Sequence, residues 1–212
     1  MTRRLLIASL IFALSGCASA NYAFWNKFGY EKRDILVSRV ESAKADQEKA
    51  KEQFKTTLER FQELTGYQGG DLEAKYKKLS AEYDRCKSRA DDVSGRIKSV
   101  DVVAQDMFRE WKTELSEYKD PKLKAASEQK LSDAQNRYAT LIELMRKSEA
   151  KMQPVLTAFH DQVLFLKHNL NAQAVASLQT TAAGIETDVQ ALIKDMEASI
   201  NEANSFIAQM KT

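Results

Sequence analysis

Apolar and aromatic side chains recur every three or four residues through most of this chain, which is the spacing of one helix face. The clearest register steps by alternating fours and threes from Leu72 to Tyr118. Its positions are Leu72, Tyr76, Leu79, Tyr83, Cys86, Ala90, Val93, Ile97, Val100, Ala104, Met107, Trp111, Glu114 and Tyr118. All except Glu114 are apolar or aromatic, and a sustained repeat of 3.5 residues predicts coiled-coil-like packing.

Two further registers predict two further helices. The C-terminal one consists of Val175, Leu178, Ala182, Ile185, Val189, Leu192, Met196, Ser199, Ala203, Phe206 and Met210. A weaker one consists of Leu36, Val40, Ala43, Gln47, Ala50, Phe54, Thr57, Phe61 and Leu64. Strand-like alternation does not extend over any useful length, so the chain is predicted to be all-α.

Helix boundaries follow from glycine, proline and capping residues. The segment 66–70 contains three glycines and is followed by Asp71, a good N-cap. Asp120 precedes Pro121, which fits the first position of a helix, and Asn171 is a further possible cap. The predicted helices are 31–65, 71–119, 121–169 and 172–211. Pro154 falls inside the third and is expected to kink or split it.

The helix lengths predict the topology. The two middle helices have about 49 residues each, or roughly 73 Å, and short connections make consecutive helices antiparallel. The first helix then reaches back only to about residue 105, and the last only to about residue 131. We therefore predict one domain, residues 31–212: a long antiparallel heptad-patterned bundle of about four helices. The turn at residues 120–121 projects from it as a helical hairpin.

The N-terminal residues predict export. Arg3 and Arg4 precede an apolar run over residues 5–14, about half the length of a membrane span, as in a signal peptide. Leu14, Ser15, Gly16 and Cys17 then match the bacterial lipobox, so residues 1–16 are the predicted signal peptide and Cys17 the lipidated residue. Several acyl chains on one cysteine hold a protein firmly in a membrane. The alternative is a cytoplasmic protein with an apolar N-terminus and an ordinary cysteine.

Resemblance to lipoprotein sorting in Gram-negative bacteria implies the outer membrane, facing the periplasm, because Ala18 and Ser19 follow Cys17 without an Asp. Removal of Arg3 and Arg4 lowers Lys+Arg from 32 to 30, against 30 Asp+Glu. A neutral mature chain in that compartment argues against nucleic-acid binding. Cys86 would be its only thiol, either buried as a small apolar residue or forming a disulfide between two copies.

No recognisable catalytic or metal site is present in the sequence. His160 and His168 are eight residues apart, whereas paired helical metal ligands usually sit four apart. The glycines of segment 66–70 lead into Asp71 and Leu72 instead of the Lys and Ser or Thr of a phosphate loop. No serine sits in a nucleophile elbow. We therefore expect no enzyme activity and no cofactor.

Two segments stand out as possible contact sites. Residues 17–30, the lipidated N-terminus and its linker, contain Tyr22, Phe24, Trp25, Phe28 and Tyr30, followed by Lys32 and Arg33. These aromatic residues either rest among lipid headgroups or cover the end of the bundle as ordinary core. Residues 152–170 carry a broad apolar face, formed by Val155, Leu156, Phe159, Val163, Leu164, Phe165, Leu166 and Leu170. This face is either buried among several helices or forms a groove for a partner helix.

The chain also resembles a family of uncharacterised proteobacterial lipoproteins. The resemblance is carried by residues 28–36, by residues 69–76, by Pro154, Val155 and Leu156, and by residues 162–171. It covers nearly the whole mature chain and implies a coiled-coil-like architecture. Members have been labelled DNA-repair ATPases, a label that the missing phosphate loop and the signal peptide contradict here.

Two hypotheses follow for function. The first is a non-enzymatic, lipid-anchored scaffold, spacer or adaptor with an unidentified protein partner, and a homo-oligomer is possible because heptad seams also serve dimers. The alternative is a membrane-surface module. It would engage lipid through the near-anchor aromatic residues and through the hairpin residues Phe108, Trp111, Leu115, Tyr118 and Leu123.

Overall fold

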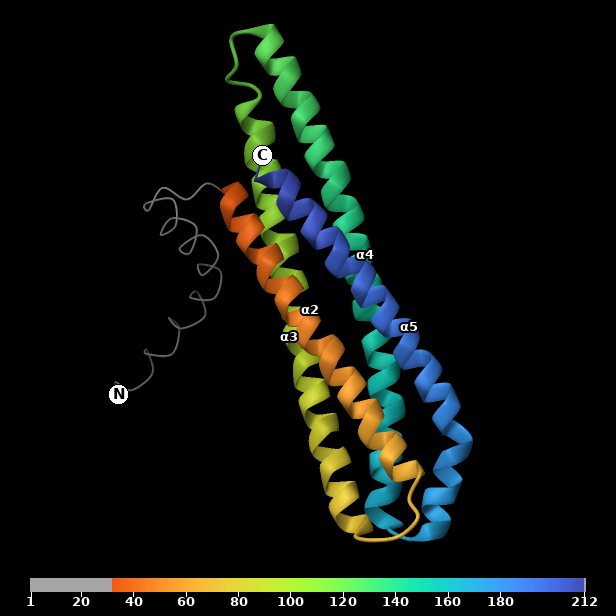
Figure 1. The fold of residues 1–212 in the computed structure, drawn as a ribbon. Helices are drawn as coiled ribbons and strands as arrows, with labels where there is room; N and C mark the ends of the chain where they lie inside the picture. Colours follow the sequence, from red (N-terminus) through yellow and green to blue (C-terminus); the bar gives the residue numbers. More distant parts are fainter. Residues whose placement is uncertain (1–31, 212) are drawn as a thin grey trace, which may run out of the picture.

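The computed structural model describes residues 32–211, which form four helices and no strand. These are α2 (Lys32–Thr65), α3 (Leu72–Glu114), α4 (Pro121–His168) and α5 (Ala172–Met210). Consecutive helices run antiparallel, and α5 packs back against α2, so that each helix contacts two neighbours (Figure 1). The predicted all-α antiparallel bundle is confirmed.

The predicted capping residues begin the helices as expected. The Asp71 carboxylate accepts a hydrogen bond from the backbone N–H of Ala74 at 2.9 Å, and Asn171 accepts one from Ala174 at 2.9 Å. Asp120 accepts from the N–H of Lys122 at 2.7 Å. These oxygens satisfy donors that a helix N-terminus leaves without a backbone partner.

One expected helix boundary is corrected, and of the two alternatives for Pro154, a kink or a split, the split is excluded. The second helix ends at Glu114, five residues before its predicted end, and Ser116 and Glu117 then donate their backbone N–H groups to carbonyls only three residues back. Pro121 in turn disfavours helical geometry in the residue before it. Asp120 accordingly has an extended backbone, with φ −87° and ψ 117°, so the chain leaves the helix before reaching it. Pro154, by contrast, does not split α4, which continues to His168. Buried Val155 and Leu156, packed in the bundle beside it, hold the helix together across the missing N–H.

The predicted heptad registers form the core. All nine register positions of α2 are buried, and so are ten of the eleven of α5, Ala182 being partly buried. In α3 the eight register positions Leu79, Cys86, Ala90, Val93, Ile97, Val100, Ala104 and Met107 are buried. Each buried Leu, Ile, Phe or Met side chain contributes about 1.5–3 kcal/mol relative to exposure.

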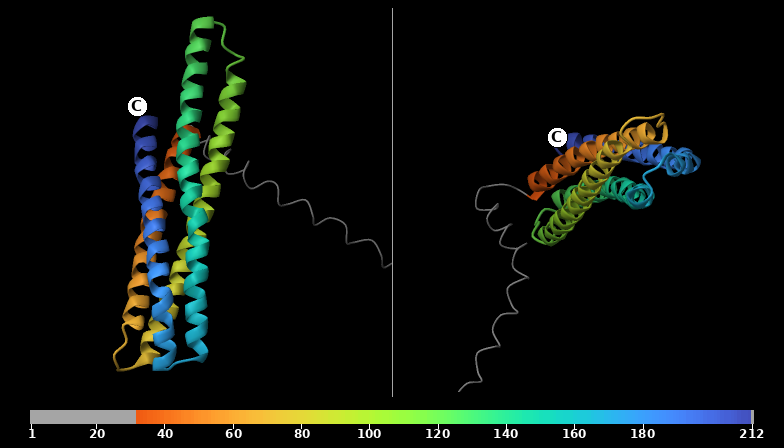
Figure 2. Two further views of the ribbon diagram at one scale, coloured as in Figure 1. Left: turned by 90° about the vertical axis from the view of Figure 1, so that its right-hand side faces the viewer. Right: turned by 90° about the horizontal axis from the view of Figure 1, so that it is seen from below.

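The hairpin formed by the end of α3 and the start of α4 projects beyond the other two helices (Figures 1 and 2). The Nζ atom of Lys32, the first residue of α2, lies 2.9 Å from Oε2 of Glu110. At the end of α5, Lys211 lies 2.8 Å from Glu41 of α2. Both outer helices therefore stop short of the turn at Asp120, and the predicted projection is confirmed.

Candidate functional site

The predicted export and anchor residues lie outside the described residues. These are Leu14, Ser15, Gly16 and Cys17, together with Tyr22, Phe24, Trp25, Phe28 and Tyr30. Their roles stay predictions. What the structure does place is the point where this segment joins the bundle: Lys32 beside Glu110, at the base of the projecting hairpin.

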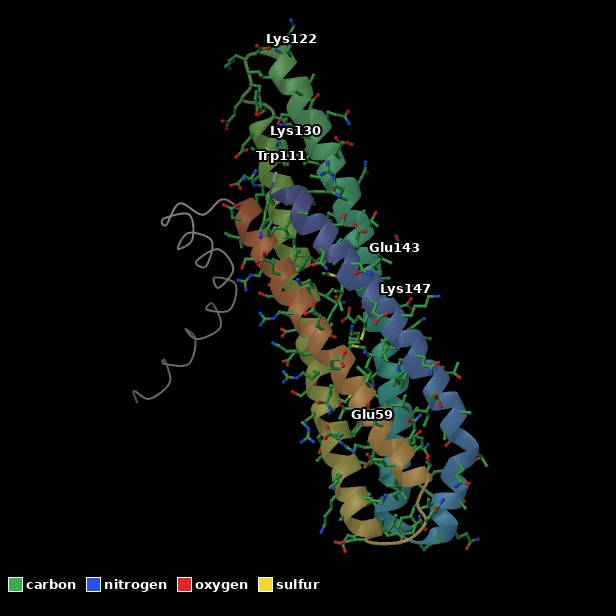
Figure 3. The ribbon with its side chains drawn as sticks, viewed as in Figure 1. Glu59, Trp111, Lys122, Lys130, Glu143 and Lys147 are labelled. Carbon is green, nitrogen blue, oxygen red and sulfur yellow. The ribbon has the colours of Figure 1, made fainter. Side chains whose placement is uncertain are left out.

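Two residues expected on the contact surface of the hairpin lie largely inside it. Phe108 is only 5% exposed, and its ring packs edge-on against Tyr138 at 5.5 Å between centroids. Trp111 is partly buried, and its indole N–H donates a hydrogen bond to Oγ of Ser127 at 2.9 Å. In Figure 3, Trp111 lies well below Lys122 at the tip. Phe108 is thus corrected from a contact residue to a core residue, and the Trp111 indole is committed to the α3–α4 pairing.

The hairpin tip presents apolar side chains of its own. Tyr118 is 41% exposed and Leu123 is 59% exposed, on either side of the turn at Asp120. Between Arg109 and Ala126 no residue is buried, and only Trp111 and Leu115 are partly buried. Two helices without a third cannot enclose side chains, so the tip offers a narrow surface with isolated apolar groups.

The broad apolar face of residues 152–170 divides into a buried part and an exposed part. Val155, Leu156, Phe159, Val163 and Leu166 are buried, so burial among several helices accounts for most of it. Leu164, Phe165 and Leu170 are 47%, 41% and 39% exposed, and we call these three residues the end patch. The end patch lies at the α4–α5 turn, at the end of the bundle opposite the hairpin (Figure 1).

A buried polar layer crosses the middle of the bundle, and two of its three members, Gln47 and Ser199, lie on the predicted seams. Nε2 of Gln47 on α2 donates to Oγ of Ser148 on α4 at 3.0 Å. Oγ of Ser199 on α5 donates to Oε1 of Gln47 at 3.0 Å. All three side chains are fully buried, and this layer links three helices by hydrogen bonds in place of apolar packing.

Two aspartates near this layer are held by cations from a neighbouring helix. Asp46 on α2 lies 2.7 Å from Arg96 on α3, and Asp195 on α5 lies 3.0 Å from Lys147 and 2.5 Å from Lys151 on α4. Burial pushes the pKa of Asp46 upward, but hydrogen bonds from Arg96 and Lys49 outweigh it, so the pKa falls below its ordinary value. The hydrogen bond from Lys151 is the main cause of the lowered pKa of Asp195. The aspartates therefore stay ionised and stabilise the helix pairs.

Cys86 is fully buried and forms no disulfide. Burial raises the pKa of its thiol to about 12, so the thiolate that exchanges disulfides is scarce. This placement agrees with the small apolar residue predicted, and a disulfide between two copies would require the bundle to open.

The histidines lie on the surface of α4. The His160 ring lies 5.6 Å from the ring of Tyr83 on α3, and both His160 and His168 are exposed. Within residues 32–211, no group of three or more His, Cys, Asp or Glu side chains is placed to hold a metal ion. In the same part of the chain, no helix combines the length and apolar character that a membrane span needs.

A family model described as "Protein of unknown function (DUF2959)" matches residues 21–210. The match includes the aromatic segment before Lys32 and all four helices. No curated protein and no solved structure matches the chain.

Proposed function

We propose that this chain, which belongs to the DUF2959 family of proteins of unknown function, is a non-enzymatic spacer or adaptor of the bacterial cell envelope. In this proposal lipid on Cys17 anchors it, at the outer membrane and facing the periplasm. One observation carries the proposal: Lys32, the first described residue, and the end patch lie at opposite ends of the four-helix body.

The shape supports a spacer. Helix α4 has 48 residues and is roughly 72 Å long at 1.5 Å per residue. Lys32, to which the predicted anchor is joined by fifteen residues, lies beside Glu110 near the hairpin, while Phe165 and Leu170 lie near the other end of α4. An anchored rod of this kind holds its far end tens of ångströms away from the point of attachment.

The end patch supports an adaptor. Leu164, Phe165 and Leu170 place three large apolar side chains within seven residues at one end of the rod. Apolar groups gathered on a surface mark sites of protein contact more often than single exposed residues do. A protein partner with an apolar anchoring side chain fits such a patch.

The anchor is tested by replacing its cysteine. We expect wild-type protein from cells to carry fatty acid and to sediment with outer membranes. Cys17→Ser should abolish both the label and the sedimentation, and Cys86→Ser, the matched control, should change neither. If wild-type protein carried no lipid and stayed in the soluble fraction, the proposed anchor would be wrong.

The adaptor role is tested by photo-crosslinking in cells. A photo-reactive residue at Phe165 should capture one recurrent protein, and Gln153, which is exposed at mid-helix on α4, is the matched control. The Phe165→Ser variant should lose co-purification of the captured protein while keeping its helicity. If position 165 captures nothing beyond the background at position 153, the end patch is not a docking site.

Exposed apolar residues at the hairpin tip favour a second candidate, a membrane-surface module. Leu123 and Tyr118 are the most exposed large apolar residues of the hairpin beyond residue 102. Flotation of the Cys17→Ser protein with phospholipid vesicles at low salt tests this candidate. Binding that Leu123→Ser abolishes would support it, and absence of binding would exclude it.

A further inference from the structure

A pocket lies between α3 and α4 near the base of the hairpin. It has a volume of about 480 Å³ and is lined by Gln105, Phe108, Arg109, Lys112, Thr113 and Gln135. Trp111, next to Lys112 in the sequence, marks its level in Figure 3. Helix α2 approaches α3 from another side, because Glu110, which pairs with Lys32, lies about 200° around α3 from Lys112. Arg109, Lys112 and Thr113 are exposed, so the pocket is open to solvent.

The lining of the pocket is cationic. Arg109 and Lys112 supply two positive charges, and none of the six lining residues is acidic. The same face of α3 continues toward the body through Gln105 and Val102 to Lys98, at steps of three and four residues. None of these five positions carries a carboxylate, so the face and its pocket favour an anion.

Two carboxylates that adjoin this face have partners of their own. Asp101 accepts hydrogen bonds from Tyr138 at 2.5 Å and from Arg146 at 2.7 Å. Asp106 pairs with Arg109 on its own helix. Such an exposed pair is weak because water screens both charges, and a guanidinium with five N–H donors can bind a second anion beside the first. Asp106 therefore leaves Arg109 able to bind a ligand.

Two polar side chains of the pocket have no protein partner. Within residues 32–211, neither the Lys112 ammonium nor the Gln135 amide makes a hydrogen bond or an ion pair. They come from the two sides of the pocket, Lys112 from α3 and Gln135 from α4. An anion held between the two helices would accept hydrogen bonds from both of them and from Arg109.

We propose that this pocket binds the phosphate group of an organic phosphate. A phosphate monoester carries a charge of about −1.5 to −2 at pH 7, which matches Arg109 and Lys112. Arginine binds phosphate oxygens through two N–H groups, and lysine binds them as a point charge. The volume of the pocket falls within the range of small-molecule sites, so an organic group fits beside the phosphate. The inference does not depend on the anchor or on the end patch.

The ligand is either a soluble phosphate ester or the headgroup of an anionic phospholipid, and two probes distinguish them. The first is glycerol 3-phosphate, added to the purified chain carrying Cys17→Ser and followed by NMR. For a soluble ligand, the backbone amides of residues 105–113 and the side-chain amide of Gln135 should shift and saturate, and glycerol should shift neither.

The second probe is a vesicle of phosphatidylcholine with added phosphatidylglycerol. For a lipid ligand, the same protein should float with these vesicles at low salt and should not float with phosphatidylcholine alone. In this case glycerol 3-phosphate should leave the amide signals unchanged.

A matched pair of variants decides whether the pocket is the site. Arg109→Gln with Lys112→Gln should weaken binding of the responding probe at least about tenfold, because two charge-assisted hydrogen bonds to the phosphate are lost. Lys130→Gln with Arg137→Gln removes the same two charges from exposed positions on α4, about 140–160° around that helix from Gln135, and should leave binding unchanged. Equal loss in both variants, or no response to either probe, would overturn the proposal.

Discussion

Helices α3 and α4 run through both the four-helix body and the two-helix hairpin, yet their side chains are buried differently in the two parts. In the body, Leu79, Val93 and Val100 of α3 are completely buried, because α2 and α4 both pack against that helix. Beyond Glu110, where α2 has ended, no residue is buried until Ser127. The number of neighbouring helices therefore decides how much stabilisation the same heptad pattern provides.

The difference also changes which face of α3 is covered. In the body the buried positions follow the seam through Val100, Ala104 and Met107. In the hairpin the covered side is that of Phe108, Trp111 and Leu115, which faces α4, as the Trp111–Ser127 hydrogen bond shows. A helix that loses one neighbour keeps only the contacts made with the other. The body should consequently unfold as a cooperative unit, while the hairpin can open locally.

The largest effect is expected from a charge in the body. Ile97→Asp places a carboxylate at a position that is 3% exposed and belongs to the hydrophobic core. We expect a loss of about 4 kcal/mol or more, or no folding at all. Thermal unfolding followed by circular dichroism measures this, with Lys98→Asp on the exposed neighbouring position as control. A Tm equal to that of the control would mean that the register of α3 is wrong.

A smaller and more local effect is expected in the hairpin. Phe108→Ala removes the ring that packs against Tyr138 and should cost about 3 kcal/mol, at the low end for a buried phenylalanine. Because only two helices meet there, hydrogen exchange should accelerate in residues 104–138 and change little in α2 and α5. Uniform acceleration across all four helices would show that hairpin and body form one cooperative unit. Phe165→Ala, an exposed ring on α4, is the control.

Much of the body could be predicted from sequence because its rules are local. The seams of α2 and α5 and the caps Asp71, Asp120 and Asn171 each depend on residues within one or two turns. The burial of Phe108 could not be found in this way. It lies beside the seam residue Met107, and the ring that covers it, Tyr138 on α4, is 30 residues away in the chain.

The hydrogen bonds of the polar layer could not be predicted from the sequence either. Gln47 occupies a seam position, which predicts that it is buried, and a buried glutamine needs hydrogen-bond partners. Those partners, Ser148 and Ser199, are 101 and 152 residues away in the chain. Ser199 also occupies a seam position of its own helix, but nothing in the spacing of Ser148 or Ser199 indicates a pairing with Gln47. The predicted contact residues of the segment 17–30 likewise depend on a membrane or protein surface that sequence alone does not specify.

The polar layer gives a prediction intermediate in size. Gln47→Leu keeps the volume but leaves the buried Ser199 hydroxyl without its acceptor, and should cost about 1–3 kcal/mol. Adding Ser148→Ala and Ser199→Ala removes the other polar groups of the layer, so most of the lost stability should return. Chemical denaturation of the single and triple variants measures both steps. A triple variant as unstable as the single one would show that the layer stabilises the body beyond its own hydrogen bonds.

The smallest effect is expected from acid, and it should also separate body from hairpin. The pKa values of Asp46 and Asp195 lie below the ordinary value of 3.8 in the folded chain, for Asp46 because the hydrogen bonds from Arg96 and Lys49 outweigh burial, and for Asp195 mainly through Lys151. A carboxyl with a lowered folded pKa contributes its full stabilisation above the unfolded pKa and loses it as pH falls through the folded pKa.

Wild-type stability should therefore drop below about pH 4, and the loss should be smaller in Asp46→Asn and Asp195→Asn, each by about 1 kcal/mol. Asp133→Asn is the hairpin control, because that carboxylate only accepts a hydrogen bond from Gln129 on the surface of its own helix. Denaturant unfolding at pH 3 and pH 7 gives the comparison. If the hairpin control flattened the pH dependence as much as the body variants do, acid would be acting through general surface charge. If only the body variants flatten it, the inter-helix pairs flanking the polar layer are where acid loosens the protein, and the hairpin takes no part.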